Sequence, residues 1–138
     1  TMKVFLDSNI ILDFLDHARP THEDAKQIVH HLIMNDIETY LSEDMLTTVY
    51  YISKDKTKAL EFFETILQIW KAVPFGLTTI LEAIAICKNE SGKDFEDVVQ
   101  CLAAKTNGCG VLVTNDKQFA QCGIEIMNSA EFLKRIEM

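Results

Sequence analysis

Short apolar runs alternate with longer segments of helical spacing along the whole chain, and this alternation constrains the fold most. The clearest runs are Val-Phe-Leu at 4–6 and Val-Leu-Val at 111–113. Runs that are apolar at every position indicate strands buried on both faces. Strands separated by helices are typical of a parallel sheet covered by helices. The sequence therefore predicts an α/β fold: a three-layer sandwich with a central, mainly parallel sheet of four to five strands flanked by helices.

The expected elements follow this periodicity and the residues that punctuate it. We expect strands at 2–6, 37–42, 72–75, 110–116 and 124–128, and helices at 8–16, 21–36, 43–54, 57–70, 78–90, 94–108 and 129–137. Thr21 followed by Asp24 is close to a capping box, and Ser129 is expected to cap the last helix. No linker, repeat or low-complexity tract appears, so residues 1–138 are expected to form one domain.

The composition is that of an acidic globular protein. Hydrophobic residues make up 48%, and the net charge is −8, which argues against a broad nucleic-acid-binding surface but not against a local basic patch. The apolar runs are far shorter than the ~20 residues of a membrane span, and no leader pattern is visible, so we expect a cytoplasmic protein with no membrane partner. Cys87, Cys101, Cys109 and Cys122 match no common zinc spacing and are expected to be free thiols.

Three acids are expected at one edge of this sheet. Asp7 follows the first strand, Asp116 follows the run at 111–113, and Asp97 lies in the first turn of the helix at 94–108. Taken singly, each is explained as a helix cap or a favourable charge at a helix N-terminus. Gathered at the carboxyl ends of parallel strands, they would repel one another unless a cation neutralised them. Oxygen ligands of this kind suit Mg²⁺ or Mn²⁺.

The segments VFLDSNIILDFL, DFEDVVQCLAA and VLVTND…F together resemble the PIN domain family, which is similar in fold to flap-type nucleases and includes VapC-type toxins. The resemblance covers nearly the whole chain. It implies a metal-dependent endoribonuclease that uses Mg²⁺ or Mn²⁺ and is the toxin component of a toxin–antitoxin pair. It also implies an RNA substrate, a homodimer and an antitoxin protein as partners.

The resemblance further implies roles for individual residues. Asp7, Asp97 and Asp116 match the family's catalytic metal ligands and would hold one or two cations. Glu96 is a further candidate ligand, although a solvated acid in the first turn of a helix explains it equally well. Three small polar residues would orient a carboxylate or a water: Ser8, Asn9 and Thr114.

The chain departs from the family at one position. The family usually has a Glu on the helix after the second strand, and the nearest match here is Thr48. Asp44 lies one turn earlier on the same helical face and is a further supporting candidate. Glu96 and Asp94 are candidate sources of the missing charge. Some branches also lack this Glu, and YYI with DFEDVVQ resembles one of them. The alternative is a catalytically weak or inactive PIN module that acts through protein binding.

Two further interpretations concern other chemistry. Lys54, Lys56 and Lys58 form the best local basic patch for an RNA backbone, although a solvated helix junction is the simpler explanation. A phosphoacceptor receiver domain would need an Asp after the third strand and a Lys after the fifth. Neither is found in AVPFGLTT or near IEIMNS, so we set this class aside.

Overall fold

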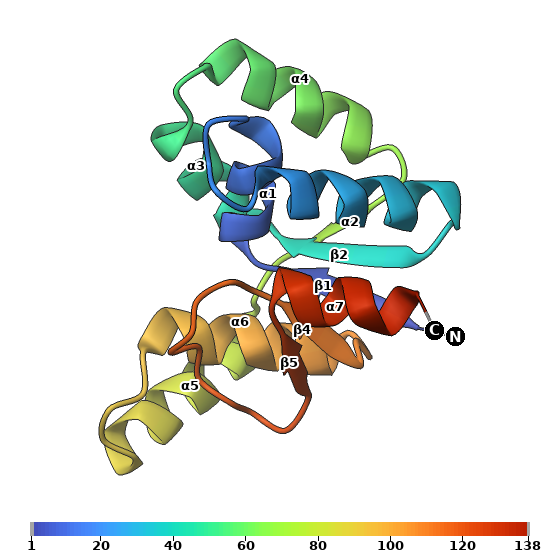
Figure 1. The fold of residues 1–138 in the computed structure, drawn as a ribbon. Coiled ribbons are helices and arrows are strands. Elements are labelled where there is room, and N and C mark those ends of the chain that lie inside the picture. Colours follow the sequence, from blue (N-terminus) through green and yellow to red (C-terminus); the bar gives the residue numbers. More distant parts are fainter. Residues whose placement is uncertain (1, 138) are drawn as a thin grey trace.

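The computed structural model describes residues 2–137, and within them the chain forms seven helices and one five-stranded sheet (Figure 1). The strands are β1 (Lys3–Leu6), β2 (Glu38–Ser42), β3 (Lys71–Val73), β4 (Val111–Val113) and β5 (Glu125–Met127). The helices are α1 (Ser8–Leu15), α2 (His22–Met34), α3 (Glu43–Ile52), α4 (Lys56–Ile66), α5 (Leu77–Asn89), α6 (Phe95–Thr106) and α7 (Ser129–Ile136). The strand order is β3-β2-β1-β4-β5, and each neighbouring pair is parallel. This confirms the predicted α/β fold.

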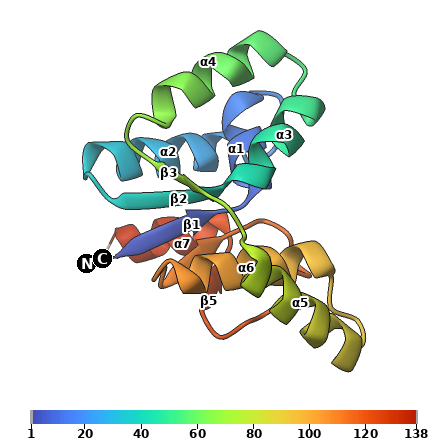
Figure 2. The same cartoon turned by 180° about the vertical axis from the view of Figure 1, so that it is seen from behind.

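Successive residues of β1 face opposite sides of the sheet, which gives the protein its three layers. Val4 and Leu6 pack into a large core with α1, α2, α3, α4 and α7. Phe5 points the other way, into a cluster with Leu112 and residues of α6. In both views α1 to α4 lie on one side of the sheet and α5 and α6 on the other, with α5 packed against α6 (Figures 1 and 2). Because both faces are covered, residues 4–6 of β1 and all of β4, the two central neighbours, are apolar at every position.

The strand order reverses beside β1, and this is where the predicted site lies. The helices that join β1 to β2 and β2 to β3 cover one face, whereas α5 and α6, which lead to β4, cover the other. The backbone N–H of Asp7 continues the ladder by donating to the Val113 carbonyl at 3.0 Å. The carboxyl ends of β1 and β4 therefore lie side by side, the position at which open α/β sheets bind ligands.

Two helix starts differ from the predicted ones. Thr21 makes no side-chain capping bond to α2, and its hydroxyl instead donates to the carboxylate of Asp13 on α1. The cap of α7 is Asn128 rather than Ser129, and Glu131 completes a reciprocal capping box with it. Both predictions were wrong because another local bond forms instead. The Thr21 hydroxyl bonds to Asp13, and Asn128, one residue before Ser129, accepts from the Glu131 backbone N–H.

Candidate active site

Asp7 is the most buried of the three predicted acids, with 7% of its surface exposed. It caps α1 by accepting a hydrogen bond from the Ser8 backbone N–H at 2.8 Å. Its other carboxylate oxygen accepts from Asn9 Nδ2 at 3.2 Å and from Thr114 Oγ1 at 2.8 Å. Burial raises the pKa of Asp7, and the nearby charge of Asp116 raises it further, while the hydrogen bonds from Thr114 and Ser8 oppose the rise. Asp7 is thus both a helix cap and a member of an acid cluster.

Thr114 joins the ends of β1 and β4. Its hydroxyl donates to Asp7, accepts from Asn9 Nδ2 at 3.0 Å, and accepts from the Asp116 backbone N–H at 3.1 Å. The side chain of Asn9 also accepts from the Asn115 backbone N–H at 3.0 Å. Asn9 and Thr114 therefore fix the backbone that carries Asp116 against the start of α1, as expected for supporting residues.

Asp97 enters the cluster from α6, on the opposite face of the sheet from α1. Asp94 caps α6 by accepting from the Asp97 backbone N–H at 3.0 Å, which places Asp97 in the first turn. Burial raises the pKa of Asp97 to about 6, and the charges of Asp94, Asp116 and Asp7 add to the rise. The backbone N–H of Ala120 opposes it. The charges of both other predicted ligands, Asp116 and Asp7, therefore act on Asp97.

Glu96 and Asp44 extend the cluster toward α3. Burial raises the pKa of Glu96, followed by the charges of Asp44, Asp7 and Asp94. Thr48, at the position where the family usually has a Glu, is one turn along α3 from Asp44, and its hydroxyl donates to the Asp44 carbonyl at 3.5 Å. The negative charge on this side of the cluster thus comes from Asp44 and Glu96 rather than from residue 48.

The carboxylates gather at one edge but do not converge on a single point. Among residues 2–137, no three His, Cys, Asp or Glu side chains are arranged closely enough to surround an ion. The donor set nevertheless fits a divalent cation. It consists of carboxylate oxygens, and the pKa values of Asp7, Glu96 and Asp97 are raised in part by mutual repulsion, which a cation would relieve. Mg²⁺ usually keeps several waters and needs only a few direct carboxylates.

Two residues that were not predicted complete the support of the site. Asn115 Nδ2 donates to Asp13 at 3.2 Å and to Ser129 Oγ at 2.8 Å, while Asn115 Oδ1 accepts from the Ser129 backbone N–H at 2.9 Å. Asp13 is 6% exposed and also accepts from Arg19 at 3.3 Å. A charged residue within the apolar run IILDFL was the signal for Asp13. For Asn115, the only signal in the sequence was its position between Thr114 and Asp116.

Cys101 and Cys122 form a disulfide, so the expectation of four free thiols was wrong for this pair. Cys101 lies on α6, one turn beyond Asp97, and Cys122 lies in the segment that joins β4 to β5. Their spacing in the sequence gave no signal because the loop path decides which thiols meet. Cys87 and Cys109 are the free cysteines within residues 2–137.

The structure has two notable clefts, of which one includes a member of the acid cluster. Asp116 and Thr114 line a cleft of about 430 Å³ together with Asn115 and Lys117. A larger cleft of about 520 Å³ opens between the α1–α2 loop and the α3–α4 junction, and none of the three predicted metal ligands lines it. Of the three predicted metal ligands, Asp116 lines the first cleft, whereas Asp7 and Asp97 line neither cleft.

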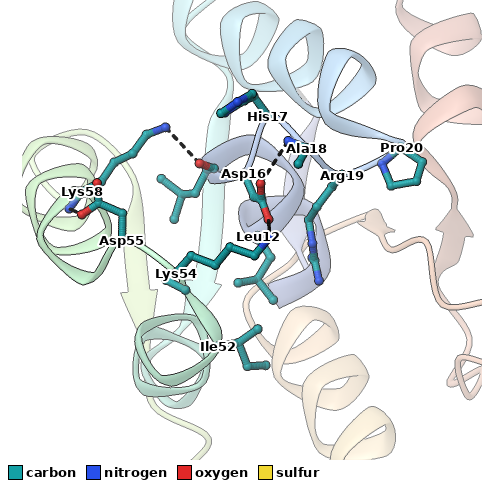
Figure 3. Close-up of a pocket in the computed structure, with 12 residues that line it drawn as sticks. Leu12, Asp16, His17, Ala18, Arg19, Pro20, Ile52, Lys54, Asp55 and Lys58 are labelled. Carbon is teal, nitrogen blue, oxygen red and sulfur yellow. Dashed lines mark hydrogen bonds and ion pairs between the residues drawn. The ribbon is translucent and has the colours of Figure 1, made fainter.

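The larger cleft contains two of the three predicted RNA-binding lysines (Figure 3). Lys58 Nζ donates to the Leu15 carbonyl at 2.9 Å, and Lys54 Nζ lies 3.5 Å from the Asp16 carboxylate. Other basic residues of the lining are His17 and Arg19.

Lys56 is placed differently from the other two lysines. Its ammonium donates to three backbone carbonyls at the end of α3, those of Tyr50, Tyr51 and Ser53, at 3.0 to 3.2 Å. The structure therefore separates Lys56, which closes a helix, from the lysines of the cleft.

A parallel sheet with carboxylates gathered at its switch point is the architecture of a PIN-type nuclease domain. The similarity of the chain to known proteins agrees with this assignment. The PIN domain family model matches residues 3–118. Ribonuclease VapC1 of Aquifex aeolicus (strain VF5) is 38% identical over 136 residues, covering 96% of this chain and 94% of that protein. The chain belongs to the PIN domain family.

Solved structures share the fold at low sequence identity. The VapC20 toxin of Mycobacterium tuberculosis, described as cleaving the sarcin-ricin loop, matches with a TM-score of 0.71 and 12% identity over 88% of this chain and 95% of that one. A chain of the VapBC2 complex of Rickettsia felis, solved with a promoter DNA fragment, matches with a TM-score of 0.68 and 16% identity over 92% and 98%. Within the part of the protein that the structure describes, we find no helix with the length and apolarity needed to cross a membrane.

Proposed function

We propose that this protein is a Mg²⁺- or Mn²⁺-dependent endoribonuclease and the toxin component of a toxin–antitoxin pair. The observation that carries the proposal is the cluster of Asp7, Asp97 and Asp116, which come from three distant parts of the chain and act on one another electrostatically. The similarity to a protein named ribonuclease VapC1 supports RNA as the substrate.

In this proposal Asp7, Asp97 and Asp116 hold the cation, with Glu96 as a further candidate ligand. When bound, the cation would supply positive charge that activates water and stabilises the charge developing on the scissile phosphate. Thr114 keeps one oxygen of Asp7 engaged at 2.8 Å and so fixes which way the carboxylate faces. Ser8 and Asn9 anchor the same carboxylate from α1.

Asp44 compensates for the absence of a Glu at position 48. Its charge contributes to the raised pKa of Glu96, so the two acids share one electrostatic environment. Thr48 then serves only within α3, where its hydroxyl donates to the Asp44 carbonyl.

The RNA backbone would follow the two clefts, whose lining residues Arg19 and Asn115 both bond to the buried Asp13. The Asp13 carboxylate contacts Arg19, from the larger cleft, and Asn115, from the cleft of Asp116. Lys54 and Lys58 retain free donor capacity because an ammonium has three N–H groups. We therefore assign them, and not Lys56, to contacts with phosphates away from the cleaved bond.

The partners of the protein follow from the same proposal. An antitoxin would bind the nuclease, and a second copy would form a homodimer, in the cytoplasm. The structural similarity to a chain of the VapBC2 complex is consistent with this arrangement.

The test is cleavage of a mixed RNA pool with Mg²⁺ and with EDTA, alongside growth on expression. We expect Mg²⁺-dependent cleavage and growth arrest from the natural chain and loss of both in Asp7→Asn. Glu61→Gln, at an exposed position on α4 outside the lining of both clefts, is the control and should retain both. Unchanged cleavage in Asp7→Asn would refute the proposal.

The second candidate is an inactive module that acts by protein binding, favoured by Thr48 at the position of the family's Glu. It predicts no RNA cleavage, and either no binding of Mn²⁺ or binding that Asp116→Asn does not weaken. Calorimetry with Mn²⁺ separates the two candidates.

A further inference from the structure

The disulfide connects the two segments that carry Asp97 and Asp116. Cys101 is four residues after Asp97 on α6, so both side chains lie on the same helical face. Cys122 closes the segment that begins with Asp116. The two cysteines are 21 residues apart in sequence, with β4 between them. The bond therefore ties one predicted metal ligand to the loop that positions another.

Asn115 anchors the start of that loop through hydrogen bonds to Asn9, Asp13 and Ser129, whereas residues 117–124 have few other anchors. Between Val113 and Glu125, all within the described residues, the chain forms no helix or strand. Phe119 is buried, and the ammonium groups of Lys93 and Lys105 donate to the carbonyls of Gln121 and Cys122 at 3.0 and 3.4 Å. Segments with few buried side chains and exposed hydrogen bonds are the ones that open most readily. The covalent bond is thus the strongest restraint on the loop.

The loop also acts on the site directly. Ala120 and Cys122 pack against the apolar cluster that contains Val98, the residue after Asp97 on α6. Ala120 lies between Asp116 and Cys122, so release at Cys122 would loosen this packing beside Asp97, while Asn115 still holds the start of the loop.

We propose that Cys101–Cys122 is a thiol–disulfide exchange site for dithiol reductants, and that its reduction loosens residues 117–124 of the loop and weakens the acid cluster toward divalent cations. The inference about cations rests on the proposed function, whereas the inference about the loop does not. Disulfides of cytosolic proteins, when present, are mostly transient and redox-sensing, which suits a site placed beside the chemistry.

Burial decides the direction of the exchange. Cys101 is fully buried, whereas Cys122 is half-buried, so the reductant's thiolate attacks Cys122 Sγ. The bond between the two protein sulfurs breaks, and its electron pair leaves on Cys101 Sγ, which takes up a proton. The second thiol of the reductant then attacks the mixed disulfide and releases Cys122 as a thiol. Two electrons and two protons reach the protein, and the reductant becomes a cyclic disulfide.

The remaining cysteines provide the controls. Burial raises the pKa of Cys109 to about 12, so this thiol is unreactive at neutral pH. Cys87 is half-buried on α5 and packs against the same apolar cluster as Cys122. Cys87 is therefore the thiol that would pair with Cys122 in place of Cys101 if the disulfide were mispaired. Cys87→Ala removes this alternative pairing without changing Cys101–Cys122.

The test compares oxidised and dithiol-reduced protein without added metal. Trypsin cleavage after Lys117, an exposed residue of the loop, is followed by mass spectrometry. We expect reduction to accelerate this cleavage several-fold in the natural chain and in Cys87→Ala. Cys122→Ala should be cleaved at the faster rate with or without the dithiol.

A Mn²⁺ titration of the same samples tests the second part, and affinity should fall several-fold on reduction. Equal cleavage after Lys117 in both redox states would overturn the proposal, as would free thiols at Cys101 and Cys122 in protein prepared without reductant. Faster cleavage with unchanged Mn²⁺ affinity would overturn the link to the acid cluster. Failure of the proposed nuclease function would appear instead as intact Mn²⁺ binding without RNA cleavage, or as no Mn²⁺ binding in either state.

Discussion

The Thr114 hydroxyl donates a 2.8 Å hydrogen bond to Asp7, and the same oxygen accepts from the Asp116 backbone N–H at 3.1 Å. Two acids that lie more than a hundred residues apart in sequence are therefore positioned by one small side chain. Thr114 is 2% exposed, so no water replaces its hydroxyl readily.

Thr114→Val tests this bridge because valine keeps the shape and removes the hydroxyl. Asp7 then loses a buried hydrogen bond, which should lower the free energy of unfolding by roughly 1–3 kcal/mol. The lost bond also raises the pKa of Asp7, so Mn²⁺ affinity should fall. Urea unfolding and calorimetry measure the two effects. Thr106→Val, at an exposed position near the end of α6, should change neither, and equal behaviour of the two variants would contradict the bridging role.

Asp97 makes the metal-free protein sensitive to pH. Its pKa is about 6 when folded and near 3.8 when unfolded, so the folded state binds the extra proton between these values. Stability is therefore gained as the pH falls through 6 toward 4, and it is lost as the pH rises through the same range. In EDTA, Asp97→Asn should raise the Tm by a few degrees at pH 7 and flatten this dependence. Glu61→Gln on α4 is the control, and a Tm of Asp97→Asn that falls at pH 7 would contradict the electrostatic account.

Asn115→Ala tests a support that the sequence did not reveal. The change removes one of three side-chain partners of the buried Asp13 carboxylate and the contact with Ser129 at the start of α7. The free energy of unfolding should fall by roughly 1–3 kcal/mol. Asn89→Ala, at the exposed end of α5, should be close to neutral in the same chemical denaturation. If both variants unfold at one midpoint, Asn115 does not connect α1 and α7 energetically.

The lysines of the larger cleft should contribute to RNA affinity through phosphates. In the double variant Lys54→Ala, Lys58→Ala, binding of a non-cleavable RNA should weaken, and the slope of log K against log salt should fall by about 1.4. Lys134→Ala on α7 is the matched control because it removes an exposed lysine elsewhere. An unchanged salt slope in the double variant would remove this cleft from the RNA path.

The gathering of acids at the sheet edge could be predicted because it depends on the backbone alone. Asp7 and Asp116 follow parallel strands, and the ends of such strands meet whatever the side chains do. The first turn of α6 was placed by the same logic, since a helix that leads into β4 begins at that edge.

Side-chain pairings could not be predicted in the same way. The choice of Thr21 between its own helix and Asp13 depends on how α1 and α2 cross, which no local pattern encodes. The disulfide depends on the path of the loop between β4 and β5, because only that path brings Cys122 to α6. Predictions that depended only on the path of the backbone were confirmed. The predictions for Thr21 and for Cys101 and Cys122 depended on a partner from another element, and they were wrong.

Binding of Mn²⁺ by Asp7→Asn, Asp97→Asn and Asp116→Asn, compared with the natural chain by calorimetry, tests the central claim most directly. Each substitution keeps the shape of the side chain and removes one charge from the cluster. We predict a clear loss of Mn²⁺ affinity in all three variants. Asp55→Asn, which changes the acid that caps α4, should leave the Mn²⁺ affinity unchanged. Mn²⁺ affinity that survives any one of them unaltered would contradict a cation held jointly by these three carboxylates.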